Sequence, residues 1–142
     1  MARISSFIYC IGSERNISTD GKGEMINAVG VLSAITPEYV PGLFSFSIIF
    51  SLLDYDQNIS NTIKVVLSDD AQKEIINSNE IPLPIRHEPD PIEIPNKYKG
   101  ANVCMDMRNV LFEKEGVYKT TIYFNGNSIG VYEIYVKGRK KA

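Results

Sequence analysis

Two runs of β-branched and aromatic residues, joined by the dipeptide Asn125-Gly126, fill residues 116–136. Asn and Gly tolerate the positive φ angles that a type I′ turn requires, so the dipeptide predicts a two-residue loop between antiparallel strands. This pattern constrains the fold class more than any other feature of the chain, because it requires an antiparallel hairpin. It indicates neither a substrate nor a partner.

The position of the loop also predicts the register of the hairpin. The expected cross-strand pairs are Phe124 with Asn127, Ile122 with Ile129, and Thr120 with Val131. Pairs of aromatic and β-branched residues stabilise a hairpin by roughly 0.2–1 kcal/mol each. The next apolar positions, Ile134 and Val136, are out of phase with Val131 by one residue. We therefore expect a bulge, or a strand that changes sheets, beyond Val131.

Composition favours strands along the whole chain. The 142 residues include 19 Ile and 10 Val against 7 Leu and 6 Ala. Ile and Val suit a pleated sheet, whereas Leu and Ala favour helix. This length suits one domain with its own core, so we expect residues 1–142 to form a single domain.

Residues 44–53 show the clearest strand periodicity. One predicted face is wholly apolar, and its members are Phe44, Phe46, Ile48, Phe50 and Leu52. The other face is half serine, which is typical of a sheet with one side on a core and the other partly open. Further strands are expected at residues 3–11, 24–35, 62–67 and 101–107, with a polar loop at residues 12–23.

Residues 74–81 fit either a strand or one helical turn, and no long helical pattern occurs in the chain. Seven or eight short strands with turns between them predict an all-β fold, an antiparallel two-sheet β-sandwich.

Residues 81–95 are expected to form an extended, proline-rich arm. Five prolines remove backbone donors, so this segment cannot be a central strand. Its apolar residues are Ile81, Leu83, Ile85, Ile92 and Ile94. The arm either folds back on its own sandwich or lies on a neighbouring subunit. We expect the second arrangement, because a sandwich also has sheet edges that need covering.

The turn that leads into the hairpin resembles a feature of immunoglobulin-like sandwiches. There, Gly-x-Tyr enters a late strand and the tyrosine hydroxyl bonds back to the corner. The matching residues are Gly116 and Tyr118, with Lys114 where many such domains carry an acidic residue. Tyr118 could equally be an ordinary core aromatic residue.

Together with residues 28–35, 44–53 and the hairpin at Asn125-Gly126, this turn resembles a group of small bacterial proteins of unknown function with an immunoglobulin-like sandwich. The resemblance implies a fold and carries no catalytic residues.

Potential catalytic and metal-binding residues are sparse. His87 is the single histidine, which is too few ligands for zinc and an isolated base for a catalytic triad. A sandwich could gather Asp54, Asp56 and either Asp69 or Asp70 around calcium, but such residues more often solvate turns. We therefore predict no metal, no cofactor and no enzymatic activity.

The net charge of −2 argues against general nucleic-acid binding. The start of the sequence lacks a signal-peptide pattern, and three serines interrupt the apolar stretch at residues 43–53. We therefore expect a cytoplasmic protein in which Cys10 and Cys104 are reduced thiols. Residues 137–142 form a basic tail.

These observations favour a non-enzymatic binding or assembly module that works through its surface as a homo-oligomer or with another protein. The alternative is a protein that binds a small ligand, such as a nucleotide-like anion. The candidate residues for that ligand are Arg86, Lys97, Lys99 and Arg108.

Overall fold

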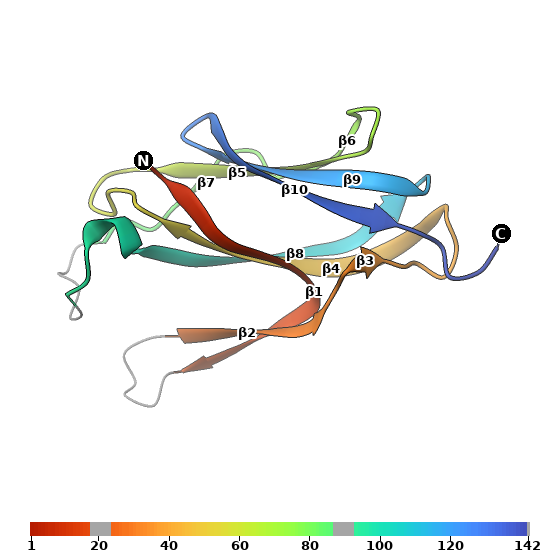
Figure 1. Cartoon of the computed structure of the whole chain (residues 1–142), viewed down its shortest axis with the longest axis horizontal. Helices are drawn as coiled ribbons and strands as arrows, with labels where there is room; N and C mark the ends of the chain where they lie inside the picture. Colours follow the sequence, from red (N-terminus) through yellow and green to blue (C-terminus); the bar gives the residue numbers. More distant parts are fainter. Residues whose placement is uncertain (18–23, 87–92, 142) are drawn as a thin grey trace.

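The computed structural model describes residues 1–17, 24–86 and 93–141, which form two sheets packed face to face (Figure 1). The strands in chain order are β1 Arg3–Ile17, β2 Glu24–Val31, β3 Ala34–Ile35, β4 Gly42–Leu53, β5 Thr62–Ser68, β6 Glu74–Asn77, β7 Ile81–Pro82, β8 Gly100–Phe112, β9 Gly116–Phe124 and β10 Asn127–Val136. A single-turn 3₁₀ helix, η1 Asn96–Tyr98, precedes β8. The predicted all-β architecture of two sheets is confirmed.

One sheet has the order β2-β1-β4-β8, and the other has the order β3-β10-β9-β5-β6, with β7 also paired to β5. Within the described residues, the strand pairs are antiparallel except for β3 and β10, which are parallel. Consequently β8 and β6 are edge strands of different sheets. The same part of the chain contains no helix long and apolar enough to cross a membrane.

The core lies between the sheets and follows the predicted strand periodicity. In β4 the buried positions are Phe46, Ile48, Phe50 and Leu52, while Phe44 is half-buried. In β5 they include Ile63, Val65 and Leu67. The alternation of apolar residues therefore identified the inner face of β4 correctly, and β5 buries alternate residues in the same way.

The predicted hairpin forms, but its register was predicted wrongly beyond the turn. Phe124 pairs with Asn127 as expected, whereas Ile122 pairs with Gly130 and Thr120 pairs with Tyr132. The register shifts between Ser128 and Gly130, so the bulge lies before Val131 rather than after it. The shift turns Ile134 and Val136 into the core and leaves Val131 exposed. Core burial of two large side chains thus determines where the bulge lies.

The prediction of a loop at residues 12–23 was wrong for its first part, because β1 continues to Ile17 as a ribbon with β2. The Cys104 thiol of β8 donates a hydrogen bond to the Ser13 hydroxyl at 3.2 Å, although β4 separates β1 from β8 in the sheet. The ribbon therefore folds across the outer face of β4. There Ser47 is only 2% exposed, so this face is more covered than its serines predicted.

Residues 24–35 were predicted as one strand but form two. The chain leaves the first sheet after Val31 and joins the second as β3, alongside β10. Gly30 has a φ of 67°, and a side chain there would approach Ile11 to 3.0 Å. Glycine therefore suits this position both by its backbone conformation and by the close approach of Ile11.

Strand β8 is longer than the predicted residues 101–107. It continues through a bulge at Arg108 and Asn109 and adds Val110 and Phe112 to the core. Asn109 has a φ of 52°, a conformation that Asn tolerates, and the Ser45 hydroxyl accepts a hydrogen bond from its backbone N–H. Residues 74–77 are a strand, which decides between the two alternatives for that segment.

The start of the proline-rich segment pairs with its own sandwich. Pro82 lies opposite Thr62 at the sheet edge, and the Leu83 N–H donates to the Asn61 carbonyl at 2.9 Å. An edge position suits proline, since no ladder donor is needed there. His87 and Ile92 lie outside the described residues.

Candidate functional site

A pocket of about 620 Å³ opens between the edge strands β6 and β8. We call it the corner pocket. Its apolar lining comes from both sheets: Ile75 and Ile76 belong to β6, and Val110 and Leu111 belong to β8. Its volume lies within the range of roughly 300–1,000 Å³ that is typical of small-molecule sites.

A bulge in each wall shapes the corner pocket. In β6 the register shifts between the partners of Leu67 and Ser68, which leaves Ile75 as an extra residue. In β8 the extra residue falls at Arg108 and Asn109, opposite Ser45. Bulges bend a strand and redirect its side chains, and they recur next to functional sites. Here they bring Ile75 and Arg108 to the lining of one pocket.

The turn between β5 and β6 is held by the side chain of Asp69. This carboxylate accepts hydrogen bonds from the backbone N–H groups of Ala71 and Lys73, both at 2.9 Å. The Lys73 N–H bond, more than the ammonium of Lys114, holds the pKa of Asp69 below its usual range. Asp69 is therefore a structural anchor for one rim of the pocket.

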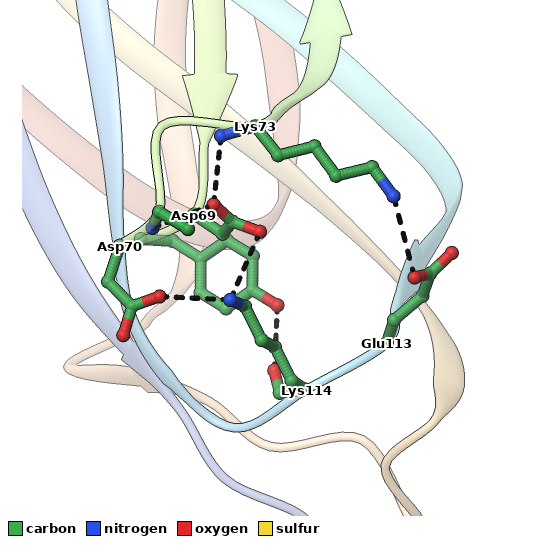
Figure 2. A network of polar contacts seen from close by, with 7 residues as sticks. Asp69, Asp70, Lys73, Glu113 and Lys114 are labelled. Atoms are coloured by element: carbon green, nitrogen blue, oxygen red, sulfur yellow. Dashed lines mark hydrogen bonds and ion pairs between the residues drawn. The ribbon is translucent and has the colours of Figure 1, made fainter.

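Lys114 connects this turn to the loop between β8 and β9 (Figure 2). Its ammonium lies 3.5 Å from an Asp69 carboxylate oxygen and 3.1 Å from one of Asp70. The Tyr118 hydroxyl donates to the Lys114 carbonyl at 2.7 Å, so the corner hydrogen bond anticipated for Tyr118 is present. The tyrosine is also buried, which makes it a core residue as well.

A third ion pair joins the same two turns in a more exposed position. Figure 2 shows Lys73 extending from its turn toward Glu113, and their charged atoms lie 3.6 Å apart. Both side chains are more than 60% exposed, at 67% and 63%. Exposed pairs of this kind contribute little to stability, so a ligand can displace this contact at small cost.

Two further charged residues line the corner pocket without an opposite charge. Among the ion pairs in residues 1–17, 24–86 and 93–141, none involves Arg108 or Glu74. The Glu74 carboxylate accepts a hydrogen bond from the Asn77 side-chain amide at 3.1 Å. The pocket thus combines apolar walls, two internal ion pairs and one unpaired charge of each sign.

A sequence model described as a family of unknown function (DUF6941) matches residues 17–137. The chain belongs to the DUF6941 family. The expected resemblance to proteins of unknown function is thereby confirmed. Among curated proteins, none matches the chain. Membership of the DUF6941 family assigns no activity to the corner pocket, so its chemistry must be argued from its residues.

The four basic residues predicted to bind a ligand do not form one site in this DUF6941 protein. Arg108 lines the corner pocket, toward the far end of β8 from Lys99. The Lys97 carbonyl accepts a hydrogen bond from Arg3, and Arg86 donates to the Gln57 side chain at 3.1 Å. Of the predicted set, the structure therefore brings only Arg108 to this pocket.

The acidic residues considered for calcium are also separated. Asp54 and Asp56 precede β5, whereas Asp69 and Asp70 follow it, and a seven-residue strand spans roughly 20 Å. Asp56 instead accepts a hydrogen bond from the Asn58 N–H at 2.9 Å. Within the described chain, no group of three or more His, Cys, Asp or Glu side chains is placed to hold a metal ion.

The predicted interface residues have different environments. Leu83 is buried and Ile81 is half-buried in their own chain, whereas Ile85 and Ile94 are 42% and 41% exposed. Lys73, Glu74 and Glu113 line the pocket but were not predicted from the sequence as site residues. Their only local signal is a concentration of charges at two turns, which does not reveal that the turns meet in space.

Proposed function

We propose that this protein is a non-enzymatic binding module that holds a small anionic molecule in the corner pocket. The observation that carries the proposal is the environment of Arg108. Arg108 lies at the bulge of β8 and lines the pocket together with apolar residues, and no ion pair of the described chain involves it. A planar guanidinium binds carboxylates and phosphates through paired hydrogen bonds, so an anionic group is the natural ligand for this position.

The pocket walls support a ligand that is more than a free anion. Val110 and Leu111 follow the bulge in β8, and Ile75 and Ile76 lie on the opposite wall. Burial of an apolar group against them adds roughly 25 cal/mol per Å² of apolar surface removed from water. The proposed ligand therefore has an anionic group and an apolar body.

Thermal denaturation with a panel of carboxylates and phosphate esters, including AMP, tests the proposal. A ligand at a hundred times its Kd adds about 2.7 kcal/mol to the free energy of unfolding. We expect Arg108→Gln to abolish the rise in melting temperature that a binding probe gives. Lys97→Gln, a matched change at one of the other three predicted positions, should leave it intact. If Arg108→Gln leaves every shift unchanged, the corner pocket is not the site.

We also infer that the two-sheet fold is an immunoglobulin-like sandwich. Two observations support this assignment. The Tyr118 hydroxyl bonds back to the Lys114 carbonyl across the β8–β9 corner, as a tyrosine corner does. The second sheet also contains the consecutive pairing β10-β9-β5-β6, which corresponds to the extended sheet of variable-type domains.

Assembly through the proline-rich segment is a second candidate function, favoured by the exposure of Ile85 and Ile94. We propose that these two residues contact a second subunit or another protein. The double variant Ile85→Ser/Ile94→Ser spares Leu83 and therefore the core. Light scattering should show a lower mass for this variant than for the parent protein. A parent that is already monomeric at micromolar concentration would exclude self-assembly.

We place this function in the cytoplasm. Cys10 and Cys104 are both free thiols, which suits a reducing compartment.

A further inference from the structure

Among the residues described, two of the charged residues that line the corner pocket have no oppositely charged partner. Six charged residues line it: Asp69, Lys73, Glu74, Arg108, Glu113 and Lys114. Lys114 pairs with Asp69, and Lys73 pairs with Glu113. The two charged residues without a partner charge among the residues described are the cation Arg108 and the anion Glu74.

These two charges belong to opposite walls. Arg108 lies in β8 of the first sheet, and Glu74 begins β6 of the second. Each is adjacent in sequence to a residue with special geometry: Arg108 precedes the left-handed Asn109, and Glu74 precedes the bulged Ile75. Both positions are therefore fixed by backbone features and not only by side-chain rotamers.

Each of these two charged residues is followed in its own strand by apolar residues that also line the pocket. Ile75 and Ile76 follow Glu74, and Val110 and Leu111 follow Arg108 after one residue. A ligand that satisfies all these groups needs an anionic end, a cationic end and an apolar body. Specific sites combine apolar walls with a few polar groups that fix the orientation of the ligand.

We propose that the ligand of the corner pocket is a zwitterion of the amino-acid class, a free apolar amino acid or a short peptide. Its carboxylate pairs with Arg108, its ammonium pairs with Glu74, and its apolar side chain lies on the isoleucines of β6. This inference rests on the proposed function, because it takes anion capture by Arg108 as given and adds the group that Glu74 recognises.

The two existing ion pairs support the choice of a zwitterion over a dianion such as a phosphate ester. Glu113 and Asp69 already pair with the pocket lysines, so only Arg108 would face the two negative charges of a phosphate monoester, and one of them would remain without a cation. The Glu74 carboxylate in the same lining would repel this excess negative charge. A ligand of zero net charge matches a lining whose six charges also sum to zero.

Matched probes separate the contributions of the two charges. Leucine carries both charged groups, 4-methylpentanoate lacks the ammonium, and 3-methylbutylamine lacks the carboxylate. Leu-Leu and its N-terminally deaminated analogue form a second matched set for a longer ligand. Calorimetric titration of the full chain should show that at least one zwitterion binds about tenfold or more tightly than its deaminated counterpart.

Two variants then show which group of the ligand Glu74 and Arg108 each recognise. Glu74→Gln should remove the advantage of the zwitterion and leave affinity for the monocarboxylate unchanged, whereas Arg108→Gln should weaken both. The thermal unfolding midpoint of each variant without ligand shows whether it is folded, and Glu133→Gln, on β10 away from the pocket, is the matched control for Glu74→Gln.

The outcomes distinguish failure of the zwitterion inference from failure of the proposed function on which it rests. If deaminated and zwitterionic probes bind equally and Glu74→Gln changes neither, the zwitterion inference is overturned and anion binding at Arg108 stands. If carboxylates bind but Arg108→Gln has no effect on them, or if no carboxylate, phosphate ester or zwitterion binds, the proposed function itself fails. A phosphate ester that binds more tightly than every zwitterion also overturns the inference.

Discussion

The phenol oxygen of Tyr9 in β1 and the hydroxyl oxygen of Thr120 in β9 lie 2.6 Å apart in the interior, where they join the two sheets. Tyr9 also donates to the Tyr132 carbonyl at 3.1 Å, and the Tyr132 ring stacks on Phe7 with 4.1 Å between centroids. This side of the sandwich is therefore closed by polar and aromatic contacts. The opposite side, between β6 and β8, contains the corner pocket.

We expect the Tyr9–Thr120 contact to be energetically coupled. In a double-mutant cycle with Tyr9→Phe and Thr120→Val, the coupling energy from denaturant unfolding should be about 1 kcal/mol. The same cycle with the exposed Tyr135 in place of Tyr9 is the control and should give a value near zero. Additive effects of Tyr9→Phe and Thr120→Val would show that the contact does not stabilise the fold.

Tyr9 should also make stability depend on alkaline pH. Burial raises the pKa of its hydroxyl to about 12, against a smaller lowering by the Thr120 hydrogen bond. An unfolded tyrosine has a pKa of about 10, so the unfolded state loses its proton first as the pH rises. The stabilisation is fully present below about pH 10 and is lost as the pH rises toward 12. The difference in unfolding free energy between the parent and Tyr9→Phe should shrink over this window. A difference that stays constant over this window would contradict a raised pKa for the Tyr9 hydroxyl.

Removing the Tyr118 hydroxyl should destabilise the corner beside the pocket. Tyr118→Phe leaves the Lys114 carbonyl without this hydrogen bond, and we expect a loss of about 1–2 kcal/mol in unfolding free energy. Tyr135→Phe, at an exposed position, is the matched control and should change stability by less than about 0.5 kcal/mol. Equal losses in the two variants would show that the corner bond contributes nothing.

Asp69 should stabilise the protein only above the acid range. Its folded-state pKa is lowered, first by the Lys73 N–H bond and then by Lys114. The contribution is therefore present above the unfolded pKa, about 3.9, and is lost as the pH falls through the lower folded value. Unfolding free energies of the parent and Asp69→Asn, measured from about pH 6 to about pH 2, should converge at the acid end. Parallel curves would argue against a stabilising charge on Asp69.

Core and outer-face substitutions in β4 should differ in cost. Phe50 is fully buried between the sheets, so Phe50→Ala should lower the unfolding free energy by about 3–5 kcal/mol. Ser47 lies on the other face but is also buried, and its hydroxyl donates to Asp106 at 2.5 Å. Ser47→Ala should therefore cost about 1 kcal/mol, which is less than Phe50→Ala but more than an exposed serine would cost. Equal unfolding midpoints for the two variants would reverse the assignment of the faces.

The contacts that could be predicted from the sequence are those that depend on neighbouring residues. The Asn125-Gly126 turn follows from local backbone preference, and the buried face of β4 follows from alternation of apolar residues. The Tyr118 corner bond spans only four residues, so its motif was visible as one of two alternatives. Arg108 was identified as a candidate by its charge alone.

The register of the β9–β10 hairpin and the residues that form the corner pocket could be established only from the tertiary structure. The sequence predicted that a bulge was needed near Val131, but only packing of Ile134 and Val136 against the other sheet decides that it lies between Ser128 and Gly130. The corner pocket depends on turns that are about forty residues apart, at Asp69–Lys73 and Glu113–Lys114, meeting through ion pairs. Local backbone preference and residue alternation determine where a turn forms and which face of a strand is buried, because both depend on residues that are close in sequence. Long-range packing decides which turns meet, because a strand can pair with many others at similar local cost.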